Sequence, residues 1–269
     1  MKTILIIGGD DRLLVTEKQL IRQGFRVGTL GLKAEEHGSF AESDVYLLPV
    51  PSTRDGKHVF APLTGAVIPL AAVTQAAGDR LVLGCNCNLN VANYIDYGSL
   101  DGYSLLNAVP TAEGAIKLAI ENTDFTLWKS RVLVIGYGRV GKILADRLRA
   151  LGCSVTVSAR KSGDLCLADA LHYDYVRTED LNRTPLDYDI VFNTVDHLVL
   201  DEQTLRESRI SLMIELASKN GFDMETAKAC GIKAIKAPGL PGKVAPVTAG
   251  KILSQTVTEI LSRHYPANH

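Results

Sequence analysis

A glycine-rich turn between a short apolar strand and a helix constrains the fold more than any other feature. Residues 131–135 form the apolar run, 136–141 read Gly-Tyr-Gly-Arg-Val-Gly, and a helical pattern covers 142–151. In a β-α-β unit, the first glycine allows a tight bend, the second lets a pyrophosphate approach the backbone, and the third allows strand and helix to pack closely. The turn predicts a dinucleotide site, with an ordinary glycine-rich turn as the alternative. The residues assigned to the cofactor here are Gly136, Gly138, Arg139, Val140 and Gly141.

The end of the next strand distinguishes between the two nicotinamide cofactors. A carboxylate at this position binds the ribose 2′-hydroxyl of NAD and would repel the 2′-phosphate of NADP. The sequence has Ala159 where that acid is expected, flanked by Ser158 and followed by Arg160 and Lys161. Cationic and hydroxyl groups make charge-assisted bonds to a phosphate. We therefore predict NADP rather than NAD, with a solvent-exposed basic strand end as the alternative.

Short β-branched runs alternate with helical patterns along the whole chain, as in parallel β-α-β units. The predicted fold class is α/β, with two doubly wound parallel-sheet (Rossmann-like) domains and a cleft between them, where ligands of such sheets bind. The expected strands are 4–7, 26–30, 45–48 and 80–83 in the first half, and 131–135, 155–158, 189–193, 212–216 and 232–235 in the second half.

Two helices define the expected domain boundaries. A helix is predicted to begin at Pro110 and run to about Thr126, with Thr111 as N-cap and Glu113 in its first turn, between the two domains. The last helix, 248–263, is expected to return to the first half. The predicted domains are residues 1–109 plus 247–269, on the substrate side, and residues 110–246, which bind the dinucleotide.

Charge and cysteine content exclude several classes of protein. Twenty-nine basic and 30 acidic residues leave a net charge of −1, so no overall field favours nucleic acid or an anionic membrane. No run approaches the roughly 18 apolar residues of a membrane span. Five cysteines without a Cys-x-x-Cys pair fit a reduced, cytoplasmic chain with no metal site.

A further pattern extends over nearly the whole chain and consists of the segments 107–116, 122–126, 136–141, 158–160, 193–194 and 237–246. Together these segments resemble the A-subunit family of dipicolinate synthase. The resemblance implies an NADP-dependent enzyme of spore-forming bacteria, in the cytoplasm of the mother cell. Such an enzyme would make dipicolinate from a dihydrodipicolinate, which comes from the 4-hydroxy-tetrahydrodipicolinate branch of lysine and diaminopimelate synthesis. It also implies a partner, the flavoprotein-like B subunit of dipicolinate synthase. The most distinctive piece is the tail from Pro238 to Gly250, with its Pro-Gly-Leu-Pro-Gly, Ala-Pro and Thr-Ala-Gly residues.

A dicarboxylate ring needs groups that bind its two carboxylates. Three loops are expected to line its site, namely 49–53, 110–114 and 238–246. Arg12 and Lys243 are candidate carboxylate anchors, with an ordinary surface cation as the alternative for each. Glu113 is a candidate base for the ring proton, with helix stabilisation as its alternative role. The candidate neutral donors to the substrate are Ser52, Thr53 and Thr111.

Strand ends in the second half supply further candidates. Asn193, Thr194 and Glu215 are expected near the nicotinamide ribose, with strand-end capping as the alternative. His197 follows the strand that ends near Asn193, at a place where such folds often carry a proline or a small residue. It is either a catalytic group or a histidine at the rim of the pocket.

Two other functions remain open from the sequence. One is a 2-hydroxyacid or alanine dehydrogenase-like enzyme on the same two-domain plan. The other is an NADP(H)-binding scaffold or sensor subunit whose partner performs the chemistry. The sequence also leaves open whether the chain forms a homo-oligomer.

Overall fold

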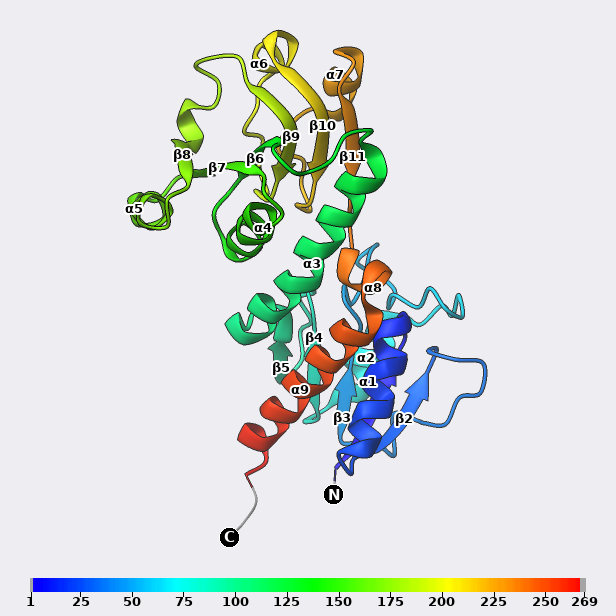
Figure 1. The fold of residues 1–269 in the computed structure, drawn as a ribbon. Helices are drawn as coiled ribbons and strands as arrows, with labels where there is room; N and C mark the ends of the chain where they lie inside the picture. The colour runs from blue at the N-terminus through cyan, green and yellow to red at the C-terminus, as the bar shows by residue number, and fades with distance from the viewer. Residues whose placement is uncertain (1, 267–269) are drawn as a thin grey trace. The chain divides into compact units, whose positions relative to one another are not determined.

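The computed structural model describes residues 2–266, which form two compact α/β units (Figure 1). Unit 1 combines the chain up to Asn107 with the chain from Pro241 onward, and unit 2 spans Ala108–Leu240. The outermost ends of the predicted substrate-side domain, Met1 and 267–269, lie outside the described residues. The predicted fold class of two parallel-sheet α/β domains is confirmed.

Unit 1 contains a five-stranded sheet in the order β2-β1-β3-β4-β5, and every neighbouring pair is parallel. Parallel neighbours need a crossover connection, and the helices of this unit supply some of them. The elements of this part of the chain are β1 (Thr3–Ile7), α1 (Asp11–Arg22), β2 (Arg26–Leu30), β3 (Val45–Leu47), α2 (Leu70–Ala77), β4 (Leu81–Gly84), β5 (Asn93–Asp96) and a 3₁₀ turn, η1 (Tyr97–Ser99).

The apolar run of β1 is buried on both faces because helices cover both sides of the sheet. Ile4 and Ile6 contribute to one core cluster, together with residues of α1 and of α9 (Pro246–His264). Leu5 and Ile7 contribute to a second cluster, together with residues of α2. This alternation is the two-residue periodicity of a strand, with apolar side chains required on each face.

Helix α9 packs closely against α1 through a glycine. A Cβ placed on Gly250 would lie 2.5 Å from the carbonyl oxygen of Arg12, so only a glycine allows this approach. The hydroxyl of Thr16 donates to the Gly250 carbonyl at 3.0 Å and joins the two helices. The final helix is therefore an integral part of unit 1.

Unit 2 contains a six-stranded parallel sheet in the order β11-β10-β9-β6-β7-β8. Its strands are β6 (Arg131–Ile135), β7 (Ser154–Ala159), β8 (Asp174–Arg177), β9 (Asp187–Asn193), β10 (Arg209–Glu215) and β11 (Lys233–Lys236). Its helical elements are α4 (Arg139–Ala150), α5 (Ser162–Ala170), the 3₁₀ turn η2 (Thr178–Asp180), α6 (Glu202–Glu207) and α7 (Met224–Ala229). Within residues 2–266, no helix has the length and hydropathy needed to cross a membrane.

The expected start of the helix at Pro110 is wrong. Helix α3 (Asp101–Asn122) begins nine residues earlier and includes Pro110 in its interior. A proline inside a helix removes one backbone hydrogen bond, which costs about 3 kcal/mol unless packing compensates for it. Here Tyr103 and Ala108, on the N-terminal side of the proline, are buried and anchor that part of the helix. Thr111 is therefore not an N-cap, and Glu113 does not lie in the first turn.

Two further expectations need correction. The segment 238–246 is partly helical, because α8 (Leu240–Val244) occupies its centre and carries Lys243. Strands β5 and β8 were not expected from the sequence. The residues of β5 are half-buried and those of β8 are mostly exposed, so neither strand has the continuous apolar run that identified the other strands.

Candidate functional site

The glycine-rich turn connects β6 to α4 and shows why its outer glycines are needed. Gly136 has a φ of +94°, and a Cβ there would lie 2.5 Å from the Thr194 hydroxyl oxygen. A Cβ on Gly141 would overlap the carbonyl oxygen of Gly136 and lie 3.0 Å from its carbonyl carbon. The first glycine therefore allows the bend, and the third allows α4 to approach the end of β6.

The middle glycine faces open space. A Cβ on Gly138 would meet no atom within 4 Å, although the neighbouring glycines are tightly enclosed. Gly138 is the N-cap of α4 and provides no side-chain hydrogen bond to the first turn. The N–H groups of a first turn have no partner within the helix and lie at its positive end, which is an arrangement that binds anions. Gly138 therefore leaves open space beside the first turn of α4, and binding of a diphosphate there stays a prediction.

A pocket of about 210 Å³ adjoins this turn and brings several predicted residues together. It includes both groups expected to recognise the cofactor, the glycine turn and the basic end of β7. Its lining consists of Gly136, Tyr137, Gly138, Ala159, Arg160, Lys161, Asp164, Thr178, Val195 and His197. The sequence reasoning missed Tyr137, Asp164, Thr178 and Val195. Thr178 directly follows β8. Ligands of parallel sheets bind at the carboxyl ends of the strands, so recognising β8 in the sequence would have identified Thr178 as a candidate.

The charge of this pocket is positive where β7 ends. Arg160 and Lys161 are both exposed there. The acidic lining residue, Asp164, is paired with Lys142 of α4 at 2.7 Å, and that ammonium also lies 5.4 Å from the centroid of the Tyr137 ring. The Asp164 charge is balanced by Lys142, so the two cations at the strand end remain available for an anion.

Ser158 lies beneath the turn rather than on the pocket surface. Its side chain is completely buried, and its hydroxyl oxygen accepts a hydrogen bond from the Gly136 N–H at 3.3 Å. The same oxygen lies 3.2 Å from the Thr178 hydroxyl. Ser158 therefore connects the turn to the segment after β8, and burial prevents direct contact with a cofactor phosphate.

Asn193 and Glu215 also lie inside the fold. Both are fully buried, and the Asn193 side-chain amide donates to the Glu215 carboxylate at 2.8 and 3.0 Å. Backbone N–H groups of Ala217 and Gly221 donate to the same carboxylate at 2.8 and 2.7 Å. Burial raises the pKa of Glu215. This network holds the loops that follow β9 and β10, which agrees with strand-end capping, and the expected place of both residues near the nicotinamide ribose stays a prediction.

Thr194 and His197 lie in the loop after β9. The Thr194 hydroxyl donates to the Ile135 carbonyl at 2.9 Å, which fixes the loop to the start of the glycine turn. His197 is exposed and lines the pocket. Its place agrees with a histidine at the pocket rim, and its catalytic role stays a prediction.

Arg12, the first candidate carboxylate anchor, is committed to an internal ion pair. Its side chain is only 5% exposed, and its Nη2 lies 2.7 Å from the Asp10 carboxylate. The guanidinium also donates to the Val50 carbonyl. A Cβ on Gly242 would lie 2.8 Å from the Arg12 Nε, so α8 covers this pair closely. Arg12 therefore joins three segments of unit 1, and its burial argues against a direct role in substrate binding.

The other substrate-side candidates have different surroundings. Ser52 is fully buried, accepts a hydrogen bond from the Cys85 N–H at 2.8 Å and donates to the Pro49 carbonyl at 3.2 Å. The Thr53 hydroxyl donates to Asp55 at 3.1 Å. Lys243 is exposed on α8, and Thr111 is half-buried in α3. Glu113 is exposed in α3, where its carboxylate lies 3.4 Å from Arg147.

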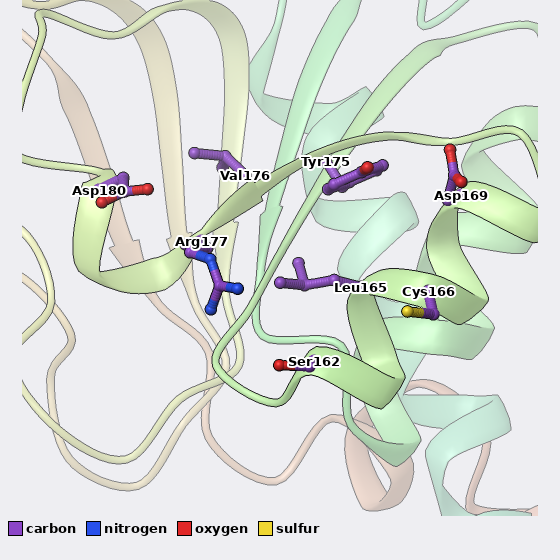
Figure 2. Close-up of a pocket in the computed structure, with 8 residues that line it drawn as sticks. All are labelled: Ser162, Leu165, Cys166, Asp169, Tyr175, Val176, Arg177 and Asp180. Carbon is purple, nitrogen blue, oxygen red and sulfur yellow. The ribbon is translucent and has the colours of Figure 1, made fainter.

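A second pocket of unit 2, of about 450 Å³, lies between α5 and β8 (Figure 2). In this view Arg177 and Ser162 are at one end of the lining, and Tyr175 and Asp169 are at the other. Ser162 and Arg177 are chain neighbours of Lys161 and Thr178, which line the pocket at the glycine-rich turn. Among the residues that the structure describes, no group of three or more histidine, cysteine, aspartate or glutamate side chains is arranged to hold a metal ion.

Comparison with known proteins gives matches over almost the whole chain. The family model for the N-terminal domain of the dipicolinate synthase A subunit matches residues 3–105. The dipicolinate synthase A subunit of Bacillus subtilis (strain 168) is 32% identical over 259 residues, covering 86% of each chain. The crystal structure of the dipicolinate synthase A subunit from Bacillus halodurans superposes with a TM-score of 0.89, at 30% identity, covering 97% of this chain and 98% of that one.

A more distant similarity concerns the fold alone. The D-lactate dehydrogenase of Escherichia coli, without ligand, superposes with a TM-score of 0.61 at 11% identity and covers 97% of this chain and 96% of that one. The two-unit architecture is therefore one that a D-lactate dehydrogenase also has.

Proposed function

The chain belongs to the A-subunit family of dipicolinate synthase, and from this premise we propose that it is an NADP-dependent oxidoreductase subunit that forms dipicolinate from a dihydrodipicolinate. The precursor would come from the 4-hydroxy-tetrahydrodipicolinate branch of lysine and diaminopimelate synthesis. The proposed setting is sporulation, in the cytoplasm of the mother cell, with the B subunit of the synthase as partner. The relatives' shared name and the dehydrogenase-like fold support the oxidoreductase assignment.

The observation that carries the proposal is the pocket at the glycine-rich turn. Open space beside Gly138 fits a diphosphate, and Arg160 and Lys161 replace the acid that NAD-binding sites place at the end of this strand. A guanidinium binds a phosphate through two parallel hydrogen bonds, and an ammonium contributes a point charge. These features favour a ribose that carries a 2′-phosphate.

Aromatisation supplies much of the driving force for the proposed reaction. An oxidised nicotinamide, when bound, accepts a hydride from a ring carbon, and a second ring hydrogen leaves as a proton. The protein's main tasks are to hold the ring at about 3–3.5 Å from the nicotinamide and to bind two carboxylates. The buried network of Asn193 and Glu215 would keep the loops beside the cofactor in place.

Cofactor selectivity tests the first part of the proposal. Titration calorimetry of the full chain should give a Kd for NADP at least about tenfold lower than for NAD, and Arg160→Ala should remove most of this difference. Arg206→Ala is the matched control, because Arg206 is exposed on α6 and does not line the pocket. Equal affinities of the wild-type protein for the two cofactors would refute NADP selectivity.

Turnover with and without the B subunit tests the second part. Reduction of NADP can be followed by absorbance after freshly prepared precursor is added to the chain. We expect turnover by this chain, increased or unchanged when the B subunit is present. Binding of NADP by this chain, with turnover only when the B subunit is present, would instead identify a scaffold or sensor subunit whose partner performs the chemistry.

A further inference from the structure

A pocket in unit 1, of about 310 Å³, has no part in the dinucleotide site. It is formed by residues 54–66, which follow β3 and lie where β1 and β4 also end. The Gly9 N–H donates to the Phe60 carbonyl at 2.8 Å, and the Phe60 N–H donates to the Ser52 carbonyl at 2.9 Å. These bonds fix the pocket at the carboxyl edge of the sheet, where α/β proteins bind their ligands. Its volume lies at the lower end of the range for small-molecule sites, about 300–1,000 Å³.

An aspartate and a histidine form a pair at this pocket. The Asp55 Oδ2 lies 2.7 Å from the His58 Nδ1, and the Oδ1 accepts hydrogen bonds from the N–H groups of Lys57 and His58, both at 2.8 Å. Thr53 donates to the same oxygen at 3.1 Å. The bond from the His58 side chain, and then those from the backbone, hold the pKa of Asp55 well below its usual range.

The ionised carboxylate determines which ring nitrogen of His58 is reactive. A carboxylate beside Nδ1 favours the proton on that nitrogen and leaves Nε2 as an acceptor. His58 itself is held in place, since it also forms a β-bridge with Pro69. The pair thus presents an imidazole with a fixed orientation next to a cavity.

The rest of the pocket provides a cation and an apolar ring. The Arg54 guanidinium lies over the Phe60 ring, with its Cζ 4.1 Å from the ring centroid. An arginine stacked in this way keeps its hydrogen-bonding edges available for a carboxylate. The remaining lining, which includes Val59 and Pro62, is largely apolar or small. Such a combination suits a flat ring that carries carboxylate groups.

We propose that this pocket binds the cyclic dicarboxylate substrate, that Arg54 binds one of its carboxylates, and that the Nε2 of His58 accepts the ring proton. The proposal rests on the proposed function. One ring C–H bond breaks and its electron pair leaves with the hydride to the oxidised nicotinamide. A second C–H bond breaks, its proton goes to Nε2 and its electron pair completes the aromatic ring. Asp55 balances the charge of the resulting imidazolium.

Product binding without cofactor tests the binding part of the proposal. Pyridine-2,6-dicarboxylate is titrated calorimetrically into the full-length chain with no nucleotide present. We expect saturable binding by wild type and at least about tenfold weaker binding by Arg54→Ala, with Arg54→Lys between them. Arg22→Ala is the control, because Arg22 is an exposed arginine of the same unit that does not line the pocket. Absence of binding by wild type, or equal binding by wild type and Arg54→Ala, would overturn the proposal.

The catalytic part has two independent readouts. His58→Gln should lower kcat about 100-fold or more while the Kd values for NADP and for pyridine-2,6-dicarboxylate stay within about threefold of wild type. Nitrogen NMR of labelled histidine should show the proton of neutral His58 on Nδ1 in wild type, and a mixture of tautomers in Asp55→Asn. Unchanged kcat in His58→Gln would overturn the assignment of His58, and so would a proton on Nε2 in wild type. If wild type reduces NADP while Arg54→Ala and His58→Gln behave as wild type, this inference fails and the proposed function stands. If wild type binds no NADP, the proposed function fails.

Discussion

Alanine at Gly138 or at Gly141 adds the same methyl group to the glycine-rich turn, yet the two substitutions should have opposite effects. At Gly138 the new Cβ meets no atom within 4 Å, so the cofactor-free fold can accept it. Loss of a glycine N-cap should cost about 1 kcal/mol or less. The methyl group would, however, occupy the space into which a diphosphate must move. We expect the NADP affinity to fall at least about tenfold, which corresponds to about 1.4 kcal/mol.

At Gly141 the same methyl group has no room. It would overlap the Gly136 carbonyl oxygen and lie 3.0 Å from the carbonyl carbon, whereas ordinary contact begins at 3.4 Å. Both neighbours are backbone atoms, so no side-chain rotation relieves the overlap and α4 must move away from β6. Overpacking of this kind costs about 1–3 kcal/mol. At about 3 kcal/mol, Tm should fall by about 6–12 °C for a chain of this size.

Thermal unfolding with and without NADP separates the two effects. Gly138→Ala should melt close to wild type alone and gain less stability from NADP, whereas Gly141→Ala should melt early under both conditions. Gly102→Ala is the control, because Gly102 is an exposed glycine of α3 where an added methyl group meets no atom within 4 Å, and it has no place in the pocket. Wild-type melting of Gly141→Ala would refute the close approach of helix and strand. Wild-type NADP affinity in Gly138→Ala would refute the position assigned to the diphosphate.

Three other substitutions test the surroundings of the site. Asp10→Asn leaves the guanidinium of Arg12 buried without its charged partner, so urea unfolding should show a loss of about 3 kcal/mol; a loss below about 0.5 kcal/mol would contradict this role. A backbone N–H of β1 donates to Asp44 and lowers its pKa from 3.8, so the unfolded chain binds more protons near that pH. Wild type should therefore lose stability as pH falls below about 4, and Asp44→Asn should lack this part of the loss; identical acid unfolding curves would show that Asp44 contributes nothing. Glu113→Gln should change stability by less than about 1 kcal/mol because its ion pair is exposed, and a large loss of turnover would assign proton transfer to Glu113 instead of His58.

The buried strands and the glycine turn could be predicted because their signals are local. A central parallel strand such as β6 needs apolar residues on both faces, and that requirement appears as an uninterrupted run in the sequence. The turn after it is recognisable since only glycine permits its backbone geometry and its close approach. The basic end of β7 could be predicted as well, because β7 is the next strand of the same β-α-β unit. Strands β5 and β8 lack such runs because β5 is only half-buried and β8 is mostly exposed.

Helix α3 shows where local rules mislead. Proline is common in the first turn of helices, and this preference placed the helix start at Pro110. Burial of Tyr103 and Ala108 stabilises the helix on the N-terminal side of the proline, so the helix continues through it. Packing energy outweighed the lost hydrogen bond, and that packing involves residues distant in the sequence.

The sequence by itself determined the α/β class, the parallel strands with long apolar runs and the place of the glycine-rich turn, because strand periodicity and glycine requirements depend only on neighbouring residues. The tertiary structure alone decided which polar side chains line a pocket and which are buried. Arg12, Ser158, Asn193 and Glu215 have the residue types of a binding site, but long-range packing buries them and directs their hydrogen bonds inward. Arg54 and His58 become a candidate site only when the segment after β3 folds over the ends of β1 and β4, since a pocket requires residues that the chain brings together from several elements.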